Sequence, residues 1–460
     1  MKKITTLLTL LIVAASAFAA EKPNILIIVA DDLGYADVSF NGGNIPTPAI
    51  DRIATEGVKL GSFYVCPVCS PTRAGLMTGR YPLRFGCMRA VLPPWRKGGM
   101  PPAERTIAEL CADAGYARRG IIGKWHLGHS EAKYLPSNQG FTHFYGHYNG
   151  AIDYFTHERE GEIDWHRNKE TVKEKGYTTD LLGAKAVSFI NDAAQDKVPF
   201  LLYLPFNAPH SPFQAHEKDI AKFPQMKGNR QKYAAMVSAL DRVVGGVLDA
   251  LDKHKLSDNT FVLFFSDNGG VVKVADNKPW RGGKTQVYEG GIRVAAAARW
   301  PDGGIKGGKT VVGSPIGYID VYPTIKQIIG EQDKTDPNPL DGITVLDIIR
   351  GKVEVPQRDW FSYIHQGGPN EKLAVISANW KLVVTTPDIL KGNIKSAELY
   401  NCQDDPAEKK NLAAANPERC EKLLAKLRAF RELQHNPLPQ YSVGKKGFKA
   451  PKDWVVGESR

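Results

Sequence analysis

Two unbroken apolar runs place the strongest limit on the folds open to this chain. Residues 24–30 read NILIIVA and residues 260–265 read TFVLFF, without the alternation of a half-exposed strand. Runs of this kind are typical of strands buried on both faces, at the centre of a parallel or mixed sheet. Between them lie three stretches with helical spacing and one further strand, at 105–116, 179–193, 232–254 and 199–210. This order predicts an α/β fold in which helices flank a large mixed β-sheet.

Each apolar run ends in carboxylate or amide side chains. Asp31 and Asp32 follow the first run, and Asp267 and Asn268 follow the second. Ligands gather outside the carboxyl ends of strands in open α/β sheets, although such side chains also start ordinary turns. Their repetition at two strand ends favours a metal site. Oxygen ligands suit a hard cation, calcium more readily than magnesium, and we expect the ion to offset the repulsion among three carboxylates.

A change of composition near 341–351 predicts a second, smaller unit. A helix begins after Asn416, and short strand-like pieces precede it, at 360–365, 373–384 and 397–401. This pattern predicts a C-terminal α+β subdomain with an antiparallel sheet and one covering helix. We expect a catalytic domain over 21–350 and this subdomain over 351–460. From about residue 435 a basic, proline-bearing arm is expected to pack irregularly or to rim the active site.

Residues 1–20 carry the pattern of a secretory signal peptide. Two lysines precede an apolar stretch, and small residues end the segment. The apolar part is too short to span a membrane, and no later run is long enough. We therefore expect an exported protein, periplasmic or secreted, without a membrane span. Six cysteines in such a compartment suggest disulfides, and Cys402 and Cys420 are near enough in the sequence to pair.

The charge of the chain points to an anionic partner. The formal net charge is +11, and it is spread along the chain rather than gathered in one block. We find no helix-turn-helix, no finger and no basic run interleaved with aromatic residues, so a nucleic-acid partner is not expected. An anionic small molecule or polysaccharide fits better.

Cys66 and Cys69 raise the question of a redox or metal pair. Ser70 is a good helix N-cap and Pro71 suits the first helical position, which puts Cys69 just ahead of a helix N-terminus. Such a position favours an anion. A redox pair normally belongs to a small thioredoxin-like unit, and zinc needs a second ligand pair that is not obvious here. The spacing alone leaves a redox or disulfide role for Cys69 open.

The residues after Cys69 carry a resemblance to a known family. Cys69-x-Pro71-x-Arg73, followed by AGLMTGR, resembles the signature of the type I, formylglycine-dependent sulfatases, and the chain looks like the arylsulfatase-B-like members. Five further motifs of that family follow in its order: PNILIIVADDLGYADV at 23–38, GKWHLG at 123–128, APHSPF at 208–213, FFSDNGG at 264–270 and RGGKTQVYEGGIRV at 281–294. Ala295 departs from the family pattern, which has proline there. The resemblance implies an alkaline-phosphatase-like fold and hydrolysis of sulfuric esters.

The resemblance also implies the chemistry and its residues. A dedicated maturation enzyme converts Cys69 to Cα-formylglycine, whose hydrate attacks sulfur with one hydroxyl and expels sulfate with the other. One calcium ion is held by Asp31, Asp32, Asp267, Asn268 and the modified Cys69. The remaining catalytic residues are Arg73, which steadies the hydrate, Lys124, His210 and Lys284, which bind sulfate oxygens, and His126, the base that helps to release sulfate. His210 and Lys284 are also the candidates to protonate the leaving oxygen.

The stretch 146–158 resembles the substrate side of the pocket in arylsulfatase-B-like members. We expect sugar hydroxyl contacts from His147, Asp153 and His157. Further sulfates or uronates are expected to meet basic residues after the Cys69 helix, namely Arg84, Arg89, Arg96 and Lys97. The expected substrate is a sulfated poly- or oligosaccharide. Two alternatives stay open: a formylglycine-dependent phosphoester or phosphonate-ester hydrolase, and an inactive exported carbohydrate-binding protein.

Overall fold

The fold is built around one large mixed sheet. The computed structural model describes residues 22–331, 335–434 and 440–456, so the expected signal peptide lies outside the described residues. Ten strands form the sheet in the order β13-β2-β12-β11-β1-β10-β4-β5-β8-β9. Their bounds are β1 (Asn24–Ala30), β2 (Val58–Leu60), β4 (Arg118–Lys124), β5 (His143–His147), β8 (His166–Arg167), β9 (Glu170–Thr171), β10 (Phe200–Pro205), β11 (Thr260–Ser266), β12 (Ala296–Arg299) and β13 (Lys309–Val311). The sheet confirms the predicted α/β class, with the two apolar runs as neighbouring central strands.

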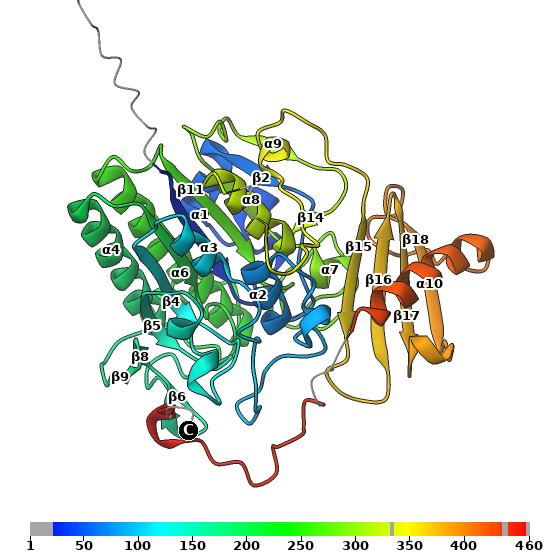
Figure 1. Ribbon diagram of the computed structural model, residues 1–460, viewed down its shortest axis with the longest axis horizontal. Helices are drawn as coiled ribbons and strands as arrows, with labels where there is room; N and C mark the ends of the chain where they lie inside the picture. The colour runs from blue at the N-terminus through cyan, green and yellow to red at the C-terminus, as the bar shows by residue number, and fades with distance from the viewer. Residues whose placement is uncertain (1–21, 332–334, 435–439, 457–460) are drawn as a thin grey trace, which may run out of the picture.

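Helices cover both faces of this sheet (Figure 1). Because alternate residues of β1 point to opposite faces, Leu26 and Ile28 pack with one set of helices, and Ile25 and Ile27 with the other. The first set is α1 (Pro48–Glu56), α4 (Thr178–Asp196) and α6 (Gly228–Lys253). The second set is α2 (Cys69–Thr78), α3 (Ile107–Asp113) and α8 (Val321–Ile328). Short helices complete the main body, namely α5 (Glu217–Ile220), α7 (Glu289–Ile292) and α9 (Leu346–Ile349).

The strand register brings the predicted site residues to one edge. β1 runs parallel to both β10 and β11, and Ala30 lies opposite Ser266. β4 runs parallel to β10, and its last residue, Lys124, lies opposite His147 of β5. The carboxyl ends of these five strands therefore share one edge, and the segments that follow them begin side by side.

A second, four-stranded antiparallel sheet lies beside the main body (Figure 1). It comprises β15 (Asp359–Ile364), β16 (Glu371–Ser377), β17 (Trp380–Thr386) and β18 (Ser396–Asn401), and α10 (Pro417–Glu432) packs against it. The single piece expected at 373–384 is wrong: β16 and β17 form a hairpin there, because Ala378 has a φ of 52° and reverses the chain. Apolar residues of both sheets belong to one core, with Trp360 of β15 next to Tyr64 and Tyr318. The boundary expected near residue 350 stays a prediction.

The last described segment returns to the main body. Residues 440–456 pass below the large sheet, as Figure 1 shows in red, and end near β6 (Glu158–Arg159), which pairs with β7 (Glu162–Ile163). One further short pair joins β3 (Phe63–Tyr64) to β14 (Ile316–Gly317).

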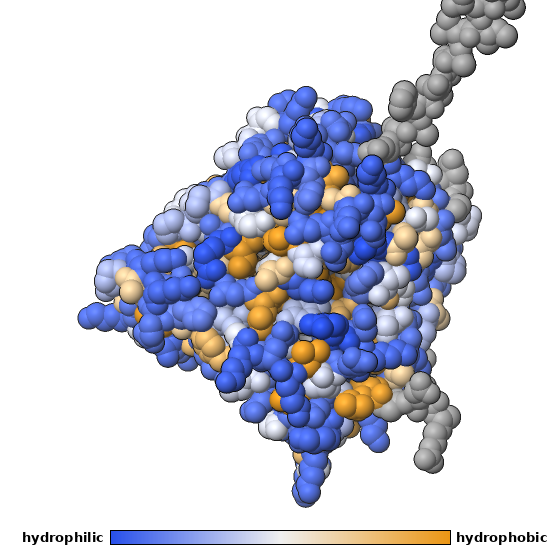
Figure 2. Space-filling model, turned by 90° about the vertical axis from the view of Figure 1, so that its left-hand side faces the viewer, coloured by the Kyte–Doolittle hydropathy of each residue, from blue (hydrophilic) through white to orange (hydrophobic). Residues whose placement is uncertain are grey.

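The face drawn in Figure 2 is mostly hydrophilic, with small scattered apolar patches. Among the described residues no helix is long and apolar enough to cross a membrane.

Candidate active site

The turn after β1 is held in a strained conformation. Asp32 has a φ of 65°, in the left-handed region that non-glycine residues rarely adopt. Three hydrogen bonds fix it: Leu33 N donates to Ser266 Oγ at 3.0 Å, the Tyr233 hydroxyl donates to the Asp32 carbonyl at 3.1 Å, and Gly34 N donates to Tyr233 Oη at 3.0 Å. Strain of this kind persists only where the surroundings over-determine the backbone. Here it directs the Asp31 and Asp32 carboxylates toward the end of β11.

Cys69 is the first residue of α2, which therefore begins two residues earlier than the expected start at Pro71. Val68 precedes the helix in an extended conformation, and Ser70 does not cap it. The Ser70 hydroxyl instead accepts a hydrogen bond from Leu92 N at 3.1 Å. The Cys69 side chain is 2% exposed, and burial raises the pKa of its thiol against the opposing charges of Lys124 and Lys284. An unmodified thiol in this place is therefore a poor nucleophile at neutral pH.

Arg73 links the Cys69 helix to the carboxylates. It lies one turn after Cys69 on the same face of α2, and it is fully buried. Its Nε and Nη2 atoms donate to Asp267 Oδ2 at 3.0 and 2.8 Å, and Nη2 reaches Asp31 Oδ2 at 3.3 Å. Burial would lower the pKa of this guanidinium, but Asp267 and other neighbouring groups raise it above its usual range. Arg73 is a fixed positive charge behind Cys69.

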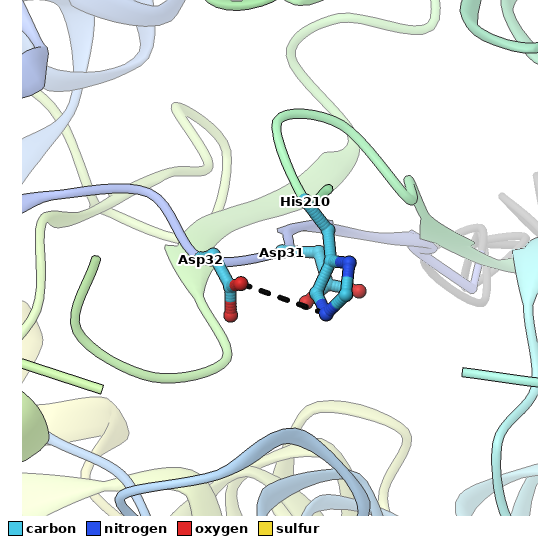
Figure 3. Close-up of side chains that lie close together, drawn as sticks. All are labelled: Asp31, Asp32 and His210. Carbon is cyan, nitrogen blue, oxygen red and sulfur yellow. Dashed lines mark ion pairs between the residues drawn. The ribbon is translucent and has the colours of Figure 1, made fainter. Parts of the chain in front are cut away.

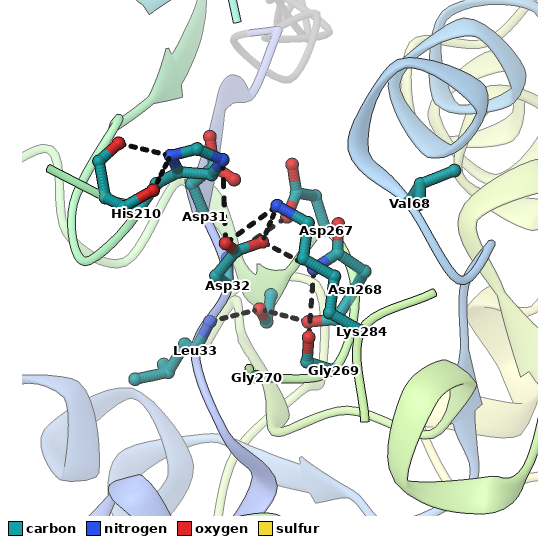
Figure 4. A network of polar contacts seen from close by, with 12 residues as sticks. Asp31, Asp32, Leu33, Val68, His210, Asp267, Asn268, Gly269, Gly270 and Lys284 are labelled. Carbon is teal, nitrogen blue, oxygen red and sulfur yellow. Dashed lines mark hydrogen bonds and ion pairs between the residues drawn. The ribbon is translucent and has the colours of Figure 1, made fainter. Parts of the chain in front are cut away.

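Three more basic side chains meet the carboxylates: His210 and Lys284 from a cavity, and Lys124 from a fully buried position. Lys124 Nζ pairs with Asp31, and Lys284 Nζ lies 2.8 Å from the Asp32 carboxylate (Figure 4). His210 Nε2 lies 3.6 Å from Asp32 Oδ2 (Figure 3). Burial and then the Lys284 charge lower the pKa of His210, whereas Asp32 and other anionic neighbours outweigh burial and raise the pKa of Lys284. Lys284 is thus charged and His210 uncharged at neutral pH.

His126 lies close to Cys69 with an uncharged ring. Its backbone is left-handed at a φ of 56°, and Nε2 contacts the Leu92 carbonyl at 3.0 Å. A side chain at Gly150 would meet the ring at 2.4 Å, so only glycine allows this approach. Burial and then the Lys124 charge hold the pKa of His126 well below its ordinary value. Nδ1 has no hydrogen-bond partner among the described residues and is free to accept a proton.

The donor set fits a hard cation. The ligand atoms of Asp31, Cys69 and Asp267 lie within 4.8 Å of one another, and so do those of Asp31, Asp32 and His210. Two buried oxygens, Asp31 Oδ1 and Asn268 Oδ1, have no hydrogen-bond partner in the described part of the chain. Such atoms are costly unless something binds them.

The expected reason for the ion needs a correction. The three carboxylates face Arg73, Lys124 and Lys284 as well as one another, so their mutual repulsion alone does not require a cation. The basic neighbours dominate the pKa of one carboxyl group, and burial dominates the pKa of another. The Lys124 charge and its basic neighbours overcome burial and hold the pKa of Asp31 well below its usual range, whereas burial and the Asp31 charge raise that of Asp267. What supports the cation is the pair of unpartnered oxygens.

A cavity of about 380 Å³ borders this cluster. Cys69, His126, His210 and Lys284 line it, as expected from the sequence. The sequence did not single out three other lining residues, namely Arg159, Gln366 and Tyr441. Arg159 comes from β6 and Gln366 from just after β15, and no local pattern links those two segments to Cys69. Tyr441 belongs to the basic arm after residue 435, for which a place at the rim of the active site was one of the two expectations.

Two of the expected sugar contacts are wrong. The His147 and His157 side chains are 0% and 1% exposed, so neither ring reaches a hydroxyl group in the cavity. His157 stacks on Trp165 with ring centroids 4.7 Å apart, and His147 Nδ1 lies 2.8 Å from the Asn149 carbonyl. Asp153 is outside the cavity lining and accepts a hydrogen bond from Gln214 at 2.6 Å. His147 is the last of four consecutive buried residues of β5, and His157 is buried against Trp165; composition alone reveals neither.

The other basic residues expected to bind substrate, and the cysteines, have the following surroundings. Arg84 pairs with Asp341 at 2.7 Å, and Arg89 Nε donates to the His365 carbonyl, so both act within the fold. Arg96 and Lys97 border a second cavity. All six cysteines are described, and each is a free thiol, so the expected Cys402–Cys420 disulfide is wrong. Cys420 Sγ instead contacts the Ala413 carbonyl at 3.8 Å.

Comparisons with known proteins agree with this site. The sequence profile of the Sulfatase family matches residues 23–331. N-acetylgalactosamine-6-sulfatase of Mus musculus is 33% identical over 358 residues, which cover 72% of this chain and 67% of that protein. Arylsulfatase J of Mus musculus is 28% identical over 465 residues, which cover 91% and 77%.

A solved structure is similar over nearly the whole chain. Ps i-CgsB in complex with k-i-k-neocarrahexaose superposes with a TM-score of 0.84 at 33% identity, and the match covers 93% of this chain and 96% of that one. This chain therefore belongs to the sulfatase family and is a sulfuric ester hydrolase.

Proposed function

We propose that this enzyme removes sulfate from sulfated poly- or oligosaccharides, with a formylglycine made from Cys69 beside one calcium ion. The observation that carries the proposal is the cluster itself. Cys69 stands at the start of α2 with its Sγ atom within 4.8 Å of ligand oxygens from Asp31 and Asp267, inside a cavity walled by basic side chains. An anionic ester and an electron-rich leaving group both require such an environment.

Two groups complete the site in this proposal. Formylglycine supplies a hydrated aldehyde, with one hydroxyl to attack sulfur and one to release sulfate, and calcium supplies positive charge beside it. Asp31, Asp32, Asp267 and Asn268 would hold the ion, and the unpartnered oxygens of Asp31 and Asn268 suit it best.

The side chains around residue 69 have different roles in the hydrolysis. Arg73 is anchored on Asp267 and keeps its charge behind residue 69. Lys284 and His210 border the cavity, where they bind sulfate oxygens and supply the proton for the leaving oxygen, and Lys124 adds its charge from the end of β4. His126 accepts a proton at Nδ1, because its ring is uncharged and that atom has no other partner among the described residues.

A carbohydrate substrate is supported by the relatives and by the cavity. One relative is an N-acetylgalactosamine-6-sulfatase, and Ps i-CgsB was solved with k-i-k-neocarrahexaose. Arg159 and Gln366 add a cation and an amide to the cavity wall, which suit a sulfated, hydroxyl-rich ligand. The proposal includes export by the signal peptide at 1–20 and conversion of Cys69 by a formylglycine-generating enzyme.

The test compares aryl sulfate and aryl phosphate esters with protein co-expressed with the maturation enzyme. We expect turnover of the sulfate at least about a hundredfold above the phosphate, and loss of both with Cys69→Ala. Equal or faster phosphate turnover would favour the phosphoester hydrolase. Binding of sulfated oligosaccharides without desulfation by fully matured protein would favour an inactive binding protein.

A further inference from the structure

A second cavity lies next to the catalytic one. Its volume is about 610 Å³, and Pro94 lines both cavities. Three aromatic rings lie in its wall: Phe448 packs against Trp95 with ring centroids 6.4 Å apart and against Trp454 with centroids 6.1 Å apart. A chain-like ligand that leaves the catalytic cavity along the segment 93–97 would enter this space next.

The C-terminal arm, defined here as residues 440–456, builds part of both cavities. Its Tyr441 lines the catalytic cavity, and its Phe448 lines the second one. Trp95 Nε1 donates to the Tyr441 carbonyl at 2.8 Å, which fixes the arm to the segment after α2. Trp454 Nε1 donates to the carbonyl of Arg159 at 2.9 Å, and Arg159 is itself in the catalytic wall. The arm therefore joins the two cavities into one continuous surface.

The charge of this surface has one sign. Lys445 lies over the Trp95 ring at 5.1 Å, and Lys97 lines the second cavity. Lys446 and Lys449 are exposed on the arm next to Lys445 in the sequence. Among the described residues that line the two cavities there is no aspartate and no glutamate. An aromatic wall with a cationic rim suits a ligand that has apolar C–H faces and carries several negative charges. A sulfated sugar chain has both properties.

We propose that the second cavity binds the sulfated sugars adjacent to the one whose ester lies at Cys69. This inference rests on the proposed function and extends it: the enzyme prefers a sulfate ester within a chain of several sugars over the same ester on a single sugar. The lysines of the arm pair with the neighbouring sulfate groups, and Phe448 packs against a sugar face. Catalysis on small esters does not use the second cavity.

The test measures how strongly sulfated hexasaccharides, k-i-k-neocarrahexaose among them, inhibit the hydrolysis of p-nitrophenyl sulfate. Each hexasaccharide is compared with the sulfated monosaccharide from which it is built. We expect one hexasaccharide or more to inhibit the wild type at least about tenfold more tightly than its monosaccharide. Lys445→Glu with Lys449→Glu should abolish that advantage, and Phe448→Ala should reduce it. The kcat/KM for p-nitrophenyl sulfate should stay within about twofold of the wild type.

A matched control is Lys253→Glu with Lys422→Glu, which makes the same change in net charge at exposed residues of α6 and α10. It should keep the hexasaccharide advantage. The inference is overturned if no hexasaccharide has an advantage, if the arm variants keep it, if the control loses it equally, or if unsulfated hexasaccharides compete as well. Failure of the wild type to hydrolyse p-nitrophenyl sulfate would instead overturn the proposed function. Thermal unfolding of each variant separates loss of the arm from loss of the fold.

Discussion

At the scale of single residues, Asp267 has two roles. It is a candidate ligand for the cation, and its Oδ2 atom accepts both hydrogen bonds that anchor the buried Arg73. Removal of this carboxylate leaves a guanidinium without its main counter-charge in the protein interior. Breaking a buried ion pair in this way typically costs about 3–5 kcal/mol. The fold therefore depends on Asp267 more than a ligand at a strand end would suggest.

We predict that Asp267→Ala loses both activity and stability. Aryl sulfate turnover should fall by at least about a thousandfold, and the free energy of unfolding by about 3–5 kcal/mol. Asp267→Asn keeps an oxygen that can accept from Arg73, so it should lose comparable activity with a smaller loss of stability. Denaturant unfolding and turnover, measured on both variants, check this. An Asp267→Ala protein as stable as the wild type would contradict the anchoring of Arg73.

The sequence predicted the centre of the site better than its walls. Asp31, Asp32, Asp267 and Asn268 could be placed together because two buried parallel strands end at one edge of a sheet. The walls depend on which way side chains point and on segments far apart in the chain. His147 and His157 are buried although their loop is polar, and Arg159 reaches the cavity from a two-residue strand that has no local signal.

At the scale of elements, a buried ion pair joins the C-terminal sheet to the catalytic loops. Lys381 of β17 is 0% exposed and lies 2.9 Å from Glu289 of α7 and 2.8 Å from Glu408. α7 begins five residues after Lys284, so β17 supports the segment that carries a catalytic side chain. Tyr64 Oη also donates to Glu289, at 2.7 Å.

We predict that Lys381→Met destabilises the protein by about 3–5 kcal/mol, because it leaves Glu408 buried without its cation and Glu289 with Arg293 alone, at 3.5 Å. Adding Glu289→Gln should recover part of this loss, since one buried charge is then removed. The double-mutant cycle, measured by denaturant unfolding, gives the coupling between the two elements. Additive effects of the two changes would show that β17 and α7 are not joined by this pair.

Asp241 of α6 gives a pH dependence that can be assigned to one contact between elements. Its carboxylate accepts from Ile50 N of α1 at 2.8 Å, and burial raises its pKa from 3.8 to about 6. A raised folded pKa means that the protonated form is favoured in the folded state. Its contribution to stability is therefore fully present below about pH 3.8 and is lost as the pH rises through about 6.

We predict that Asp241→Asn flattens the change in stability between about pH 4 and pH 7 relative to the wild type. The amide can still accept from α1, but it has no proton to lose in this range. The check is the difference in Tm between variant and wild type at several pH values, which cancels the titration of other groups. A difference that does not change with pH would show that Asp241 titrates normally in the folded protein.

Elements with a continuous signal were predicted well, and those without one were not. The strands β1 and β11 are apolar throughout, and α6 has sustained helical spacing, so their type followed from the sequence. The hairpin between β16 and β17 was missed because its turn at Ala378 and Asn379 has no glycine or proline to mark it. The short strands β6 to β9 have two residues each, too few for a periodic pattern.

At the scale of the whole molecule, the proposed calcium ion connects two strand ends about 235 residues apart in the sequence. A ligand that binds only the folded state stabilises it by mass action, by about 4 kcal/mol at a free concentration about 1,000-fold above its Kd. We predict that exhaustive chelation lowers both Tm and turnover, and that added calcium restores both. Asp32→Asn replaces the carboxylate with an uncharged amide that still offers one oxygen ligand. It should therefore raise the calcium concentration needed for recovery. Full activity after exhaustive chelation would contradict the site.

The central claim is that residue 69 acts as an aldehyde and not as a thiol. The most direct test is the mass of the peptide over residues 64–80, measured on the preparation whose aryl sulfate turnover is known. Preparations made with and without the maturation enzyme give a range of conversion. We predict that turnover is proportional to the fraction of formylglycine and vanishes with it. Full turnover from protein that carries an unmodified Cys69, or a Cys66–Cys69 disulfide, would contradict the account.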